Sequence, residues 1–255
     1  MRPCVVSHMI MSLDGRLLPQ RWGTTQTGSP MDFIERIYEA TASRLEGDAW
    51  AIGRGTMKGF FPERDVPSAI SATSELGSAI REPERLAFLG ARENRSLAVI
   101  MDPSGRYVYD SSALDEDHLL VVLSNQVDEG YLAHLRDVGI SYTFAGQDGR
   151  DVGAALESLR RDFGVSRLLL EGGGTLNGAF LAAGAIDEIS TLVYPIVDGL
   201  AGIPSIYDHA ADAPLFPAAM ASLELLSHEV LDQGVVWLRY AVLHAGGERS
   251  SASSV

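Results

Sequence analysis

Short apolar runs, separated by glycine, proline and Asp-Gly turns, are the dominant pattern along the chain. Runs of this length bounded by such breakers predict buried strands rather than helices. The stretches that predict strands in this way are residues 4–11, 48–52, 97–101, 119–123, 140–144, 168–170 and 188–194. Two further stretches, 222–231 and 235–243, are rich in β-forming residues.

Between these runs, apolar residues recur at the spacing of amphipathic helices. The clearest stripe runs from Phe33 to Leu45, and it follows Ser29, Pro30 and Asp32, which together form a typical helix start. The remaining helical stretches are residues 74–92, 128–137, 152–163 and the segment from 175 onward.

Strands that alternate with helices favour a parallel sheet covered by helices on both faces. The last two runs are joined at Asp232-Gln233-Gly234, which predicts an antiparallel hairpin. We therefore expect an α/β fold with a mostly parallel central sheet and a C-terminal hairpin. Residues 1–244 are expected to form a single domain, and residues 245–255, which are small and polar, a disordered tail.

The stretch that carries most chemistry is a strand, a glycine turn and a helix around residues 167–189. Three consecutive glycines, Gly172, Gly173 and Gly174, precede Thr175 and Leu176 at the start of the helix. Backbone N–H groups and the helix dipole favour anions at such a position, so the turn can cradle a pyrophosphate. The alternative is a tight strand-to-helix turn that merely needs glycine.

Two named phosphate motifs are excluded at this turn. A G-x-G-x-x-G fingerprint starting at Gly172 needs glycine at position 177, where Asn177 stands. The chain also lacks the Gly-Lys-Ser/Thr of a P-loop.

Two further turns lie at the ends of predicted strands. Gly53-Arg54-Gly55-Thr56 could form the other half of a dinucleotide site, and a plain turn is about as plausible. Asp14 belongs to an Asp-Gly turn, and it is also at the carboxyl end of the first strand, where open α/β sheets bind ligands. His8 lies inside that strand without a partner at metal-ligand spacing, which favours a satisfied core histidine or one that lines a ligand site over a metal ligand.

Composition and charge narrow the classes of function. The formal net charge of −14 disfavours binding to nucleic acid or anionic membranes, so attraction for a phosphate must be local. Cys4 is the only cysteine, which excludes thiolate zinc clusters and an intramolecular disulfide. No apolar run approaches a membrane span and no signal-peptide pattern is present. We expect a cytoplasmic protein that binds neither nucleic acid, membrane nor metal.

Three sequence blocks resemble the reductase domain of the riboflavin-biosynthesis deaminase–reductases. They are Ser12-Leu13-Asp14-Gly15-Arg16, Glu171 to Gly178, and Asp187-Glu188-Ile189 followed by Tyr194 to Gly199. The resemblance covers about residues 4–243 and implies a dihydrofolate-reductase-like fold without the deaminase domain. It also implies reduction of a ribosylaminopyrimidine 5′-phosphate to the ribityl form by NADPH, and a homodimer.

The resemblance assigns roles to individual residues. Asp14, Arg44 and Glu171 are implied to contact the phosphorylated pyrimidine, although the position of Arg44 also suits a cation at a helix C-terminus. The residues implied to bind NADPH are Gly53, Arg54, Thr56, Ser124, Gly172, Gly173, Gly174, Thr175 and Leu176. Arg54 is the candidate for the 2′-phosphate, and no catalytic proton donor is identified.

Two other functions remain open on the sequence. One is a related NADPH-dependent reductase with another substrate, such as dihydrofolate. The other is a nucleotide-binding module that has no catalytic activity.

Overall fold

A computed structural model of the chain describes residues 1–22, 30–58, 61–64, 85–209 and 221–244. The chain divides into two compact units. The first comprises residues 1–2 and 53–165, and the second comprises residues 3–52 and 166–255. The prediction of a single domain is not tested by this division and stays a prediction, and the predicted tail at 245–255 lies outside the described residues.

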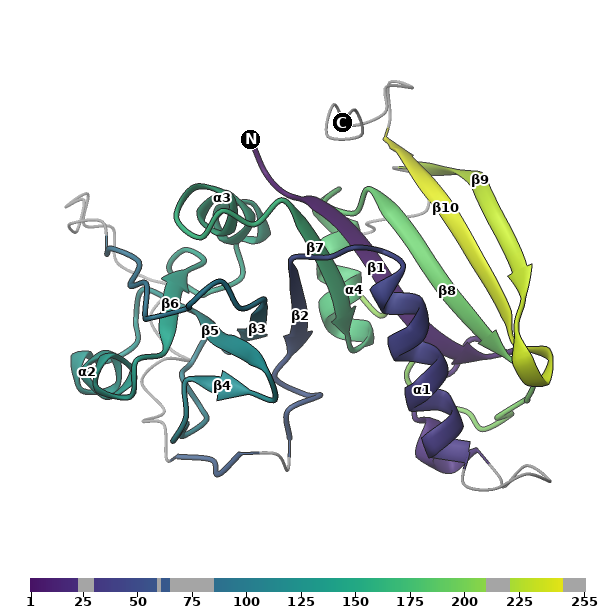
Figure 1. Cartoon of the computed structure of the whole chain (residues 1–255), viewed down its shortest axis with the longest axis horizontal. Coiled ribbons are helices and arrows are strands. Elements are labelled where there is room, and N and C mark those ends of the chain that lie inside the picture. Colours follow the sequence, from purple (N-terminus) through teal and green to yellow (C-terminus); the bar gives the residue numbers. More distant parts are fainter. Residues whose placement is uncertain (23–29, 59–60, 65–84, 210–220, 245–255) are drawn as a thin grey trace. The chain divides into compact units, whose positions relative to one another are not determined.

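The second unit is built on strands that pair side by side in the order β2, β7, β1, β8, β10 and β9 (Figure 1). Their bounds are β1 Cys4–Ser12, β2 Ala49–Gly53, β7 Arg167–Gly172, β8 Glu188–Tyr194, β9 Ala221–Val230 and β10 Val236–His244. The β2–β7, β7–β1 and β1–β8 pairs are parallel, whereas β10 runs antiparallel to both β8 and β9. The predicted mostly parallel sheet with a terminal hairpin is confirmed.

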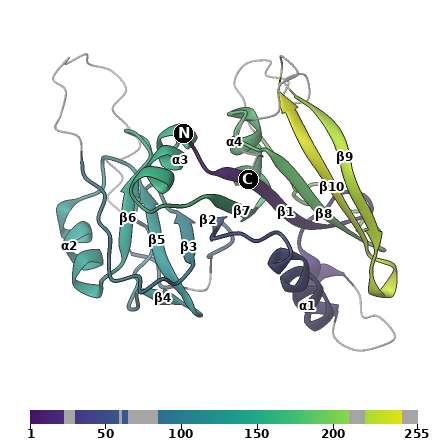
Figure 2. The same cartoon turned by 45° about the horizontal axis from the view of Figure 1, so that its top comes forward.

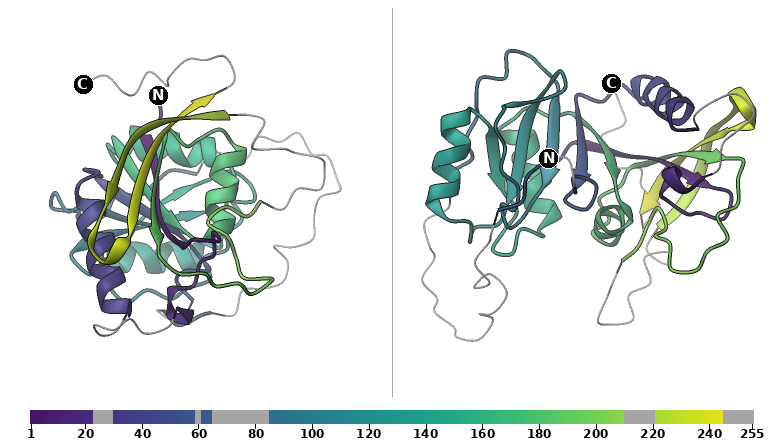
Figure 3. Two further views of the ribbon diagram at one scale, coloured as in Figure 1. Left: turned by 90° about the vertical axis from the view of Figure 1, so that its right-hand side faces the viewer. Right: turned by 90° about the horizontal axis from the view of Figure 1, so that it is seen from below.

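Two helices cover opposite faces of this sheet, as the left view in Figure 3 shows for α1 Pro30–Ser43 and α4 Gly174–Ala182. The predicted start of α1 at Pro30 is confirmed; Ser29, the expected cap, lies outside the described residues. Phe33, Ile34 and Ile37 of α1 pack into the core between the helix and the sheet. Short 3-10 turns at η1 Pro19–Arg21 and η4 Asp232–Gly234 complete the unit.

The first unit contains β3 Leu97–Met101, β4 Ala113–Leu114, β5 Asp117–Leu123 and β6 Ser141–Phe144. Strand β5 lies between β3 and β6 and is parallel to both (Figure 2), and β4 pairs with it antiparallel. Its helices are α2 Glu129–Val138 and α3 Val152–Arg161. Tyr142 and Thr143 are neighbours on β6 and therefore point to opposite faces. Since Tyr142 bonds Arg136 of α2 and Thr143 bonds Ser158 of α3, the helices cover both faces of this sheet too.

The predicted helix over residues 74–92 is wrong in its described part. Residues 85–92 are not helical, and Phe88 instead forms an isolated bridge with Tyr142 of β6. The Phe88 backbone exchanges two hydrogen bonds of 3.0 Å with that residue, and the two rings stack. Pairing with an existing strand satisfies this backbone without a helix.

A buried polar network joins α1 to the sheet. His8 on β1 is fully buried, its Nδ1 lies 3.0 Å from Ser190 Oγ, and its Nε2 lies 3.3 Å from the Tyr38 carbonyl oxygen. A carbonyl only accepts, so the neutral tautomer with the proton on Nε2 satisfies both contacts. Ser190 Oγ also accepts the indole N–H of Trp237 at 2.8 Å. His8 is thus a satisfied core histidine, as predicted.

Burial lowers the pKa of His8 from 6.5 to about 4. Between these pH values the unfolded chain binds more protons than the folded one, so stability is full above pH 6.5 and falls as the pH drops toward 4. This pKa difference between the unfolded and folded states corresponds to a loss of free energy of unfolding on the order of 3 kcal/mol when the pH falls below both values.

We expect His8→Gln to be less stable than the wild type at neutral pH and to lose less stability on acidification. Urea denaturation at pH 7 and pH 4.5 measures this difference. His228→Gln, at an exposed position of β9, is the control. Equal acid sensitivity of the wild type and His8→Gln would contradict the role assigned to His8.

Candidate functional site

At the turn from β7 into α4, the first backbone N–H groups of the helix have no hydrogen-bond acceptor among the described residues. The first intrahelical bond at this end of α4 runs from the Asn177 N–H to the Gly173 carbonyl at 3.1 Å. The N–H groups of Gly174, Thr175 and Leu176 precede it, and the N-cap residue Gly173 supplies no side chain to cap them. These donors, together with the helix dipole, form a suitable site for phosphate oxygens.

Each of the three glycines also has a reason within the fold. Gly173 has φ +77° and ψ 145°, a region that is nearly reserved for glycine. A Cβ at Gly174 would lie 2.2 Å from the Ser205 carbonyl oxygen, and one at Gly172 would lie 2.9 Å from the Leu176 side chain. The alternative interpretation, a tight strand-to-helix turn that needs glycine, therefore accounts for all three glycines. The open donors are the additional feature that suits a ligand.

The loop Ser205–Asp208 holds the start of α4 on this face of the sheet. The Asp208 N–H donates to the Gly174 carbonyl at 2.9 Å, and Asn177 Nδ2 donates to the Ile206 carbonyl at 2.9 Å. The Tyr207 hydroxyl donates to Ser7 Oγ of β1 at 2.8 Å. The sequence analysis missed this loop, because no periodic or glycine signal marks it. Asn177, which excludes the dinucleotide fingerprint, is explained by its bond to this loop.

Glu171 ends β7 on the face that α1 covers. Leu169, two residues earlier on the same strand, packs in the core with α1. Burial is the main cause of the raised pKa of Tyr38, and the charge of Glu171 raises it further. The Tyr38 hydroxyl donates to the His8 carbonyl at 2.7 Å, and the rings of Tyr38 and His8 lie 4.3 Å apart. Glu171 is partly exposed, so its carboxylate lies at the boundary between this buried network and solvent.

Asp14 has its carboxylate engaged by the chain itself. It accepts from the Ser12 hydroxyl at 2.6 Å and from the N–H groups of Asp198 and Gly199 at 3.0 Å each. These bonds, with Ser12 first, lower the pKa of Asp14 to about 2. Asp14 therefore fastens the segment after β8 to the end of β1, and a contact with substrate would be an additional role.

Arg44 follows α1 and lies against the hairpin. Its guanidinium is 4.3 Å from the ring centroid of Trp237 on β10, and Nη2 pairs with Glu229 of β9 at 2.8 Å. It lines a pocket of about 510 Å³ between α1 and the hairpin, together with Arg36 and the apolar side chains of Phe33 and Ile37. This pocket provides two guanidinium groups and an apolar floor, and the carboxylates of Glu229 and Asp232 also line it.

Asp14, Arg44 and Glu171 make their contacts at different places in the second unit. In the register of β1 with β7, Leu170, the residue before Glu171, pairs with Ser7, whereas Asp14 lies in the turn after β1 ends at Ser12. Arg44 contacts β10, separated from β7 by β1 and β8. The prediction that Arg44 and Glu171 face one cleft is not tested by these contacts and stays a prediction. The substrate role of each residue stays a separate prediction.

The remaining predicted cofactor residues lie in the first unit. Gly53, Arg54 and Thr56 form a turn after β2, closed by a 3.0 Å bond from the Thr56 N–H to the Gly53 carbonyl. Arg54 is exposed, and its Nη1 lies 3.4 Å from Ser104 Oγ. Ser124 follows β5 and is 1% exposed, with its N–H donating to the Pro103 carbonyl at 2.8 Å. Gly172 to Leu176, by contrast, belong to the second unit.

Within the described residues, no group of three or more histidine, cysteine, aspartate or glutamate side chains could hold a metal ion. No helix among them is long and apolar enough to span a membrane.

Comparison with known proteins identifies the family. The model of the RibD C-terminal domain matches residues 3–237. The chain is 30% identical to the 2,5-diamino-6-ribosylamino-4(3H)-pyrimidinone 5′-phosphate reductase of Archaeoglobus fulgidus, over 82% of this chain and 87% of that protein. It is 28% identical to the protein of the same name from Methanothermobacter thermautotrophicus, over 78% and 81% of the two chains.

The fold agrees with this relationship. A pyrimidine reductase-like protein from Corynebacterium diphtheriae superposes with a TM-score of 0.63 at 17% identity, covering 96% of this chain and 93% of that one. The family match, the identity to the reductases and the shared fold lead to one conclusion: the chain belongs to the RibD C-terminal domain family.

Proposed function

We propose that the protein reduces the ribosylamino group of a pyrimidine 5′-phosphate to the ribitylamino group in riboflavin biosynthesis, with NADPH as the reductant. The relatives named as pyrimidinone 5′-phosphate reductases support the substrate class. The observation within this chain that carries the proposal is the row of open N–H donors from Gly174 to Leu176 at the start of α4. A protein with a net charge of −14 attracts a phosphorylated ligand only through local donors of this kind.

NADPH, when bound, supplies the hydride, and the residues of the chain supply position and charge. Gly172 to Leu176 would hold the pyrophosphate by backbone N–H groups. Thr56 and Ser124 would make further contacts with the cofactor, and Arg54 would pair with the 2′-phosphate, because a guanidinium matches phosphate oxygens in pairs.

Three side chains are proposed to act on the substrate. Glu171 would accept hydrogen bonds from substrate hydroxyl or ring N–H groups, from its half-exposed position beside Tyr38. Arg44 would bind the substrate phosphate, and the guanidinium of Arg36, which lines the same pocket, supports this proposal. Asp14 would act from the end of β1 while it also fastens the neighbouring segment.

The direct test is a reductase assay on the purified chain. The oxidation of NADPH is followed with the ribosylaminopyrimidine 5′-phosphate, and dihydrofolate serves as the alternative substrate. Turnover of the pyrimidine and isolation of the ribitylamino product support the proposal. Turnover of dihydrofolate alone, or NADPH binding without turnover of either, would replace it with one of the two other functions.

Replacing Gly173 with valine should weaken NADPH binding. A valine at φ +77° forces the turn to rearrange and moves the α4 donors away from the phosphates. Calorimetric titration measures the affinity, and thermal unfolding measures the cost to the fold. Gly139→Val is the control for strain, since Gly139 has φ +83° and open space around its Cα. A Gly173→Val protein that binds NADPH as tightly as the wild type would remove this turn from the cofactor site.

Replacing Arg44 with alanine should raise the KM for the phosphorylated pyrimidine much more than the KM for NADPH. Glu229 already pairs with Arg44, and both side chains are about half exposed, so solvent screens this pair and it can yield to a phosphate. Steady-state kinetics measures both constants. Arg161→Ala, which removes another exposed and ion-paired arginine, is the control. Equal KM values in wild type and Arg44→Ala would place the phosphate site elsewhere.

We also propose that the protein works as a homodimer in the cytoplasm, and that copies meet through β9. The single buried cysteine suits a reducing compartment. Leu223, Leu225 and Val230 of β9 are 52%, 51% and 71% exposed, and in register they oppose Val242, Tyr240 and Val236 of β10. They therefore lie on one face of the hairpin, and a two-fold axis would bury that face against its own copy.

A charge on this face should produce a monomer. Leu225→Glu is expected to sediment as a monomer at concentrations where the wild type is a dimer, because the apolar contact would bury a carboxylate. Leu89→Glu, at 55% exposure in the first unit, is the control and should remain a dimer. Sedimentation velocity distinguishes the species. A monomeric wild type refutes the homodimer, whereas a dimeric Leu225→Glu refutes only the assignment to β9.

A further inference from the structure

The loop Asp102–Tyr107, which follows β3, contacts two predicted cofactor residues of the first unit, Arg54 and Ser124. The Tyr107 hydroxyl donates to the Arg54 carbonyl at 2.7 Å, and Ser104 Oγ lies 3.4 Å from the Arg54 guanidinium. On the other side, the Pro103 carbonyl accepts the Ser124 N–H at 2.8 Å. One short loop thus holds the backbone and side chain of Arg54 and the backbone of Ser124.

Asp102 fixes the shape of this loop from within. Its side chain is fully buried, and Oδ2 accepts from the N–H groups of Arg106 at 2.6 Å and Tyr107 at 3.2 Å. The Gly105 N–H donates to the Asp102 carbonyl at 2.9 Å, which closes the turn, and Gly105 has φ +59°. The conformation of the loop is therefore fixed by Asp102, the residue that directly follows β3.

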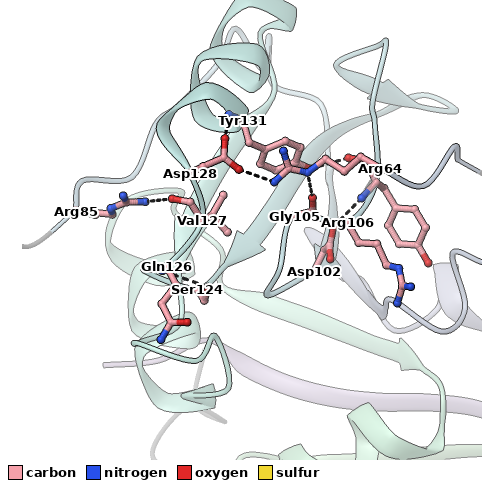
Figure 4. A network of polar contacts seen from close by, with 11 residues as sticks. Arg64, Arg85, Asp102, Gly105, Arg106, Ser124, Gln126, Val127, Asp128 and Tyr131 are labelled. Atoms are coloured by element: carbon pink, nitrogen blue, oxygen red, sulfur yellow. Dashed lines mark hydrogen bonds and ion pairs between the residues drawn. The ribbon is translucent and has the colours of Figure 1, made fainter. Parts of the chain in front are cut away.

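A second layer of contacts clamps the loop from outside (Figure 4). Arg64 donates to the Gly105 carbonyl and pairs with Asp128 at 2.8 Å, and its guanidinium lies 4.1 Å from the Tyr131 ring centroid. The Tyr131 hydroxyl donates to the Tyr107 carbonyl at 2.8 Å. Tyr107 itself is 1% exposed, so it combines a rigid position with a hydroxyl directed at Arg54.

The turn that carries Arg54 needs such support. It contains Gly53 and Gly55, and a Cβ at Gly55 would meet nothing within 4 Å, so packing at that position does not hold the turn. Arg54 is exposed, and an exposed arginine loses rotamer freedom when it binds a phosphate. A fixed backbone carbonyl and a nearby hydroxyl reduce the freedom that remains to be lost.

We infer that Tyr107 is a positioning residue that holds the Arg54 turn ready for the cofactor 2′-phosphate, and thereby sets the preference for NADPH over NADH. The inference rests on the proposed role of Arg54. Tyr107 does not touch the cofactor in this account; its hydroxyl acts through the Arg54 backbone.

The test is Tyr107→Phe, which removes only the hydroxyl. The dissociation constants of NADPH and NADH are measured by calorimetry, together with those of adenosine 2′,5′-bisphosphate and adenosine 5′-monophosphate. We expect NADPH and the bisphosphate to bind roughly three- to tenfold more weakly, the size of one neutral hydrogen bond, with NADH and the monophosphate unchanged. Tyr142→Phe is the matched control, because it removes the hydroxyl of another buried tyrosine in the same unit.

A merely structural role for Tyr107 gives a different result. Tyr107→Phe would then weaken both cofactors equally, or neither, and the inference would be overturned. Arg54→Ala separates this failure from failure of the proposed function. If Arg54→Ala abolishes the NADPH preference and Tyr107→Phe does not reduce it, only the positioning role is wrong. If Arg54→Ala leaves the preference intact, the role of Arg54 is wrong and the inference falls with it, while wild-type reductase activity still decides the proposed function.

Discussion

The backbone of Gly173 turns the chain from the end of a buried parallel strand into the first turn of α4 at φ +77° and ψ 145°. Any side chain there would be strained, and a capping side chain would satisfy the donors of the helix. Glycine avoids the strain, and because it has no side chain it leaves the N–H groups of Gly174 to Leu176 without a cap. The proposed cofactor site, the position of Glu171 one residue before the turn and the packing of the Ser205–Asp208 loop all depend on this geometry.

Much of the fold could be predicted because several of its strands, such as β1, β3 and β5, are almost entirely buried. Such strands appear as continuous apolar runs, and β3 and β8 begin and end where the runs do. The predictions fail where tertiary pairing replaces a local signal. Phe88 lies in the stretch predicted to be helical, but it pairs with Tyr142 in an extended segment. The two-residue strand β4 is too short for any periodicity to reveal it.

The candidate site was only partly predictable, because several motif residues are accounted for by interactions within the chain. Asp14 caps the segment after β8. Asp187 accepts the Val5 N–H at 2.8 Å, and Glu188 pairs with Arg167 and Arg239. These bonds join sequence blocks that lie far apart in the chain, which spacing alone cannot show. Tyr38 and Tyr107 belong to no motif, and only the structure shows that their hydroxyl groups contact the backbones of His8 and Arg54.

The central claim is that the backbone donors at the start of α4 bind the cofactor pyrophosphate. Amide chemical shifts of an isotopically labelled protein, followed by NMR during titration with NADPH, test it most directly. The account predicts that the amides of Gly174, Thr175 and Leu176 shift along a saturable curve, with an affinity that matches calorimetry. Saturable shifts elsewhere, with these three amides unchanged, would contradict it.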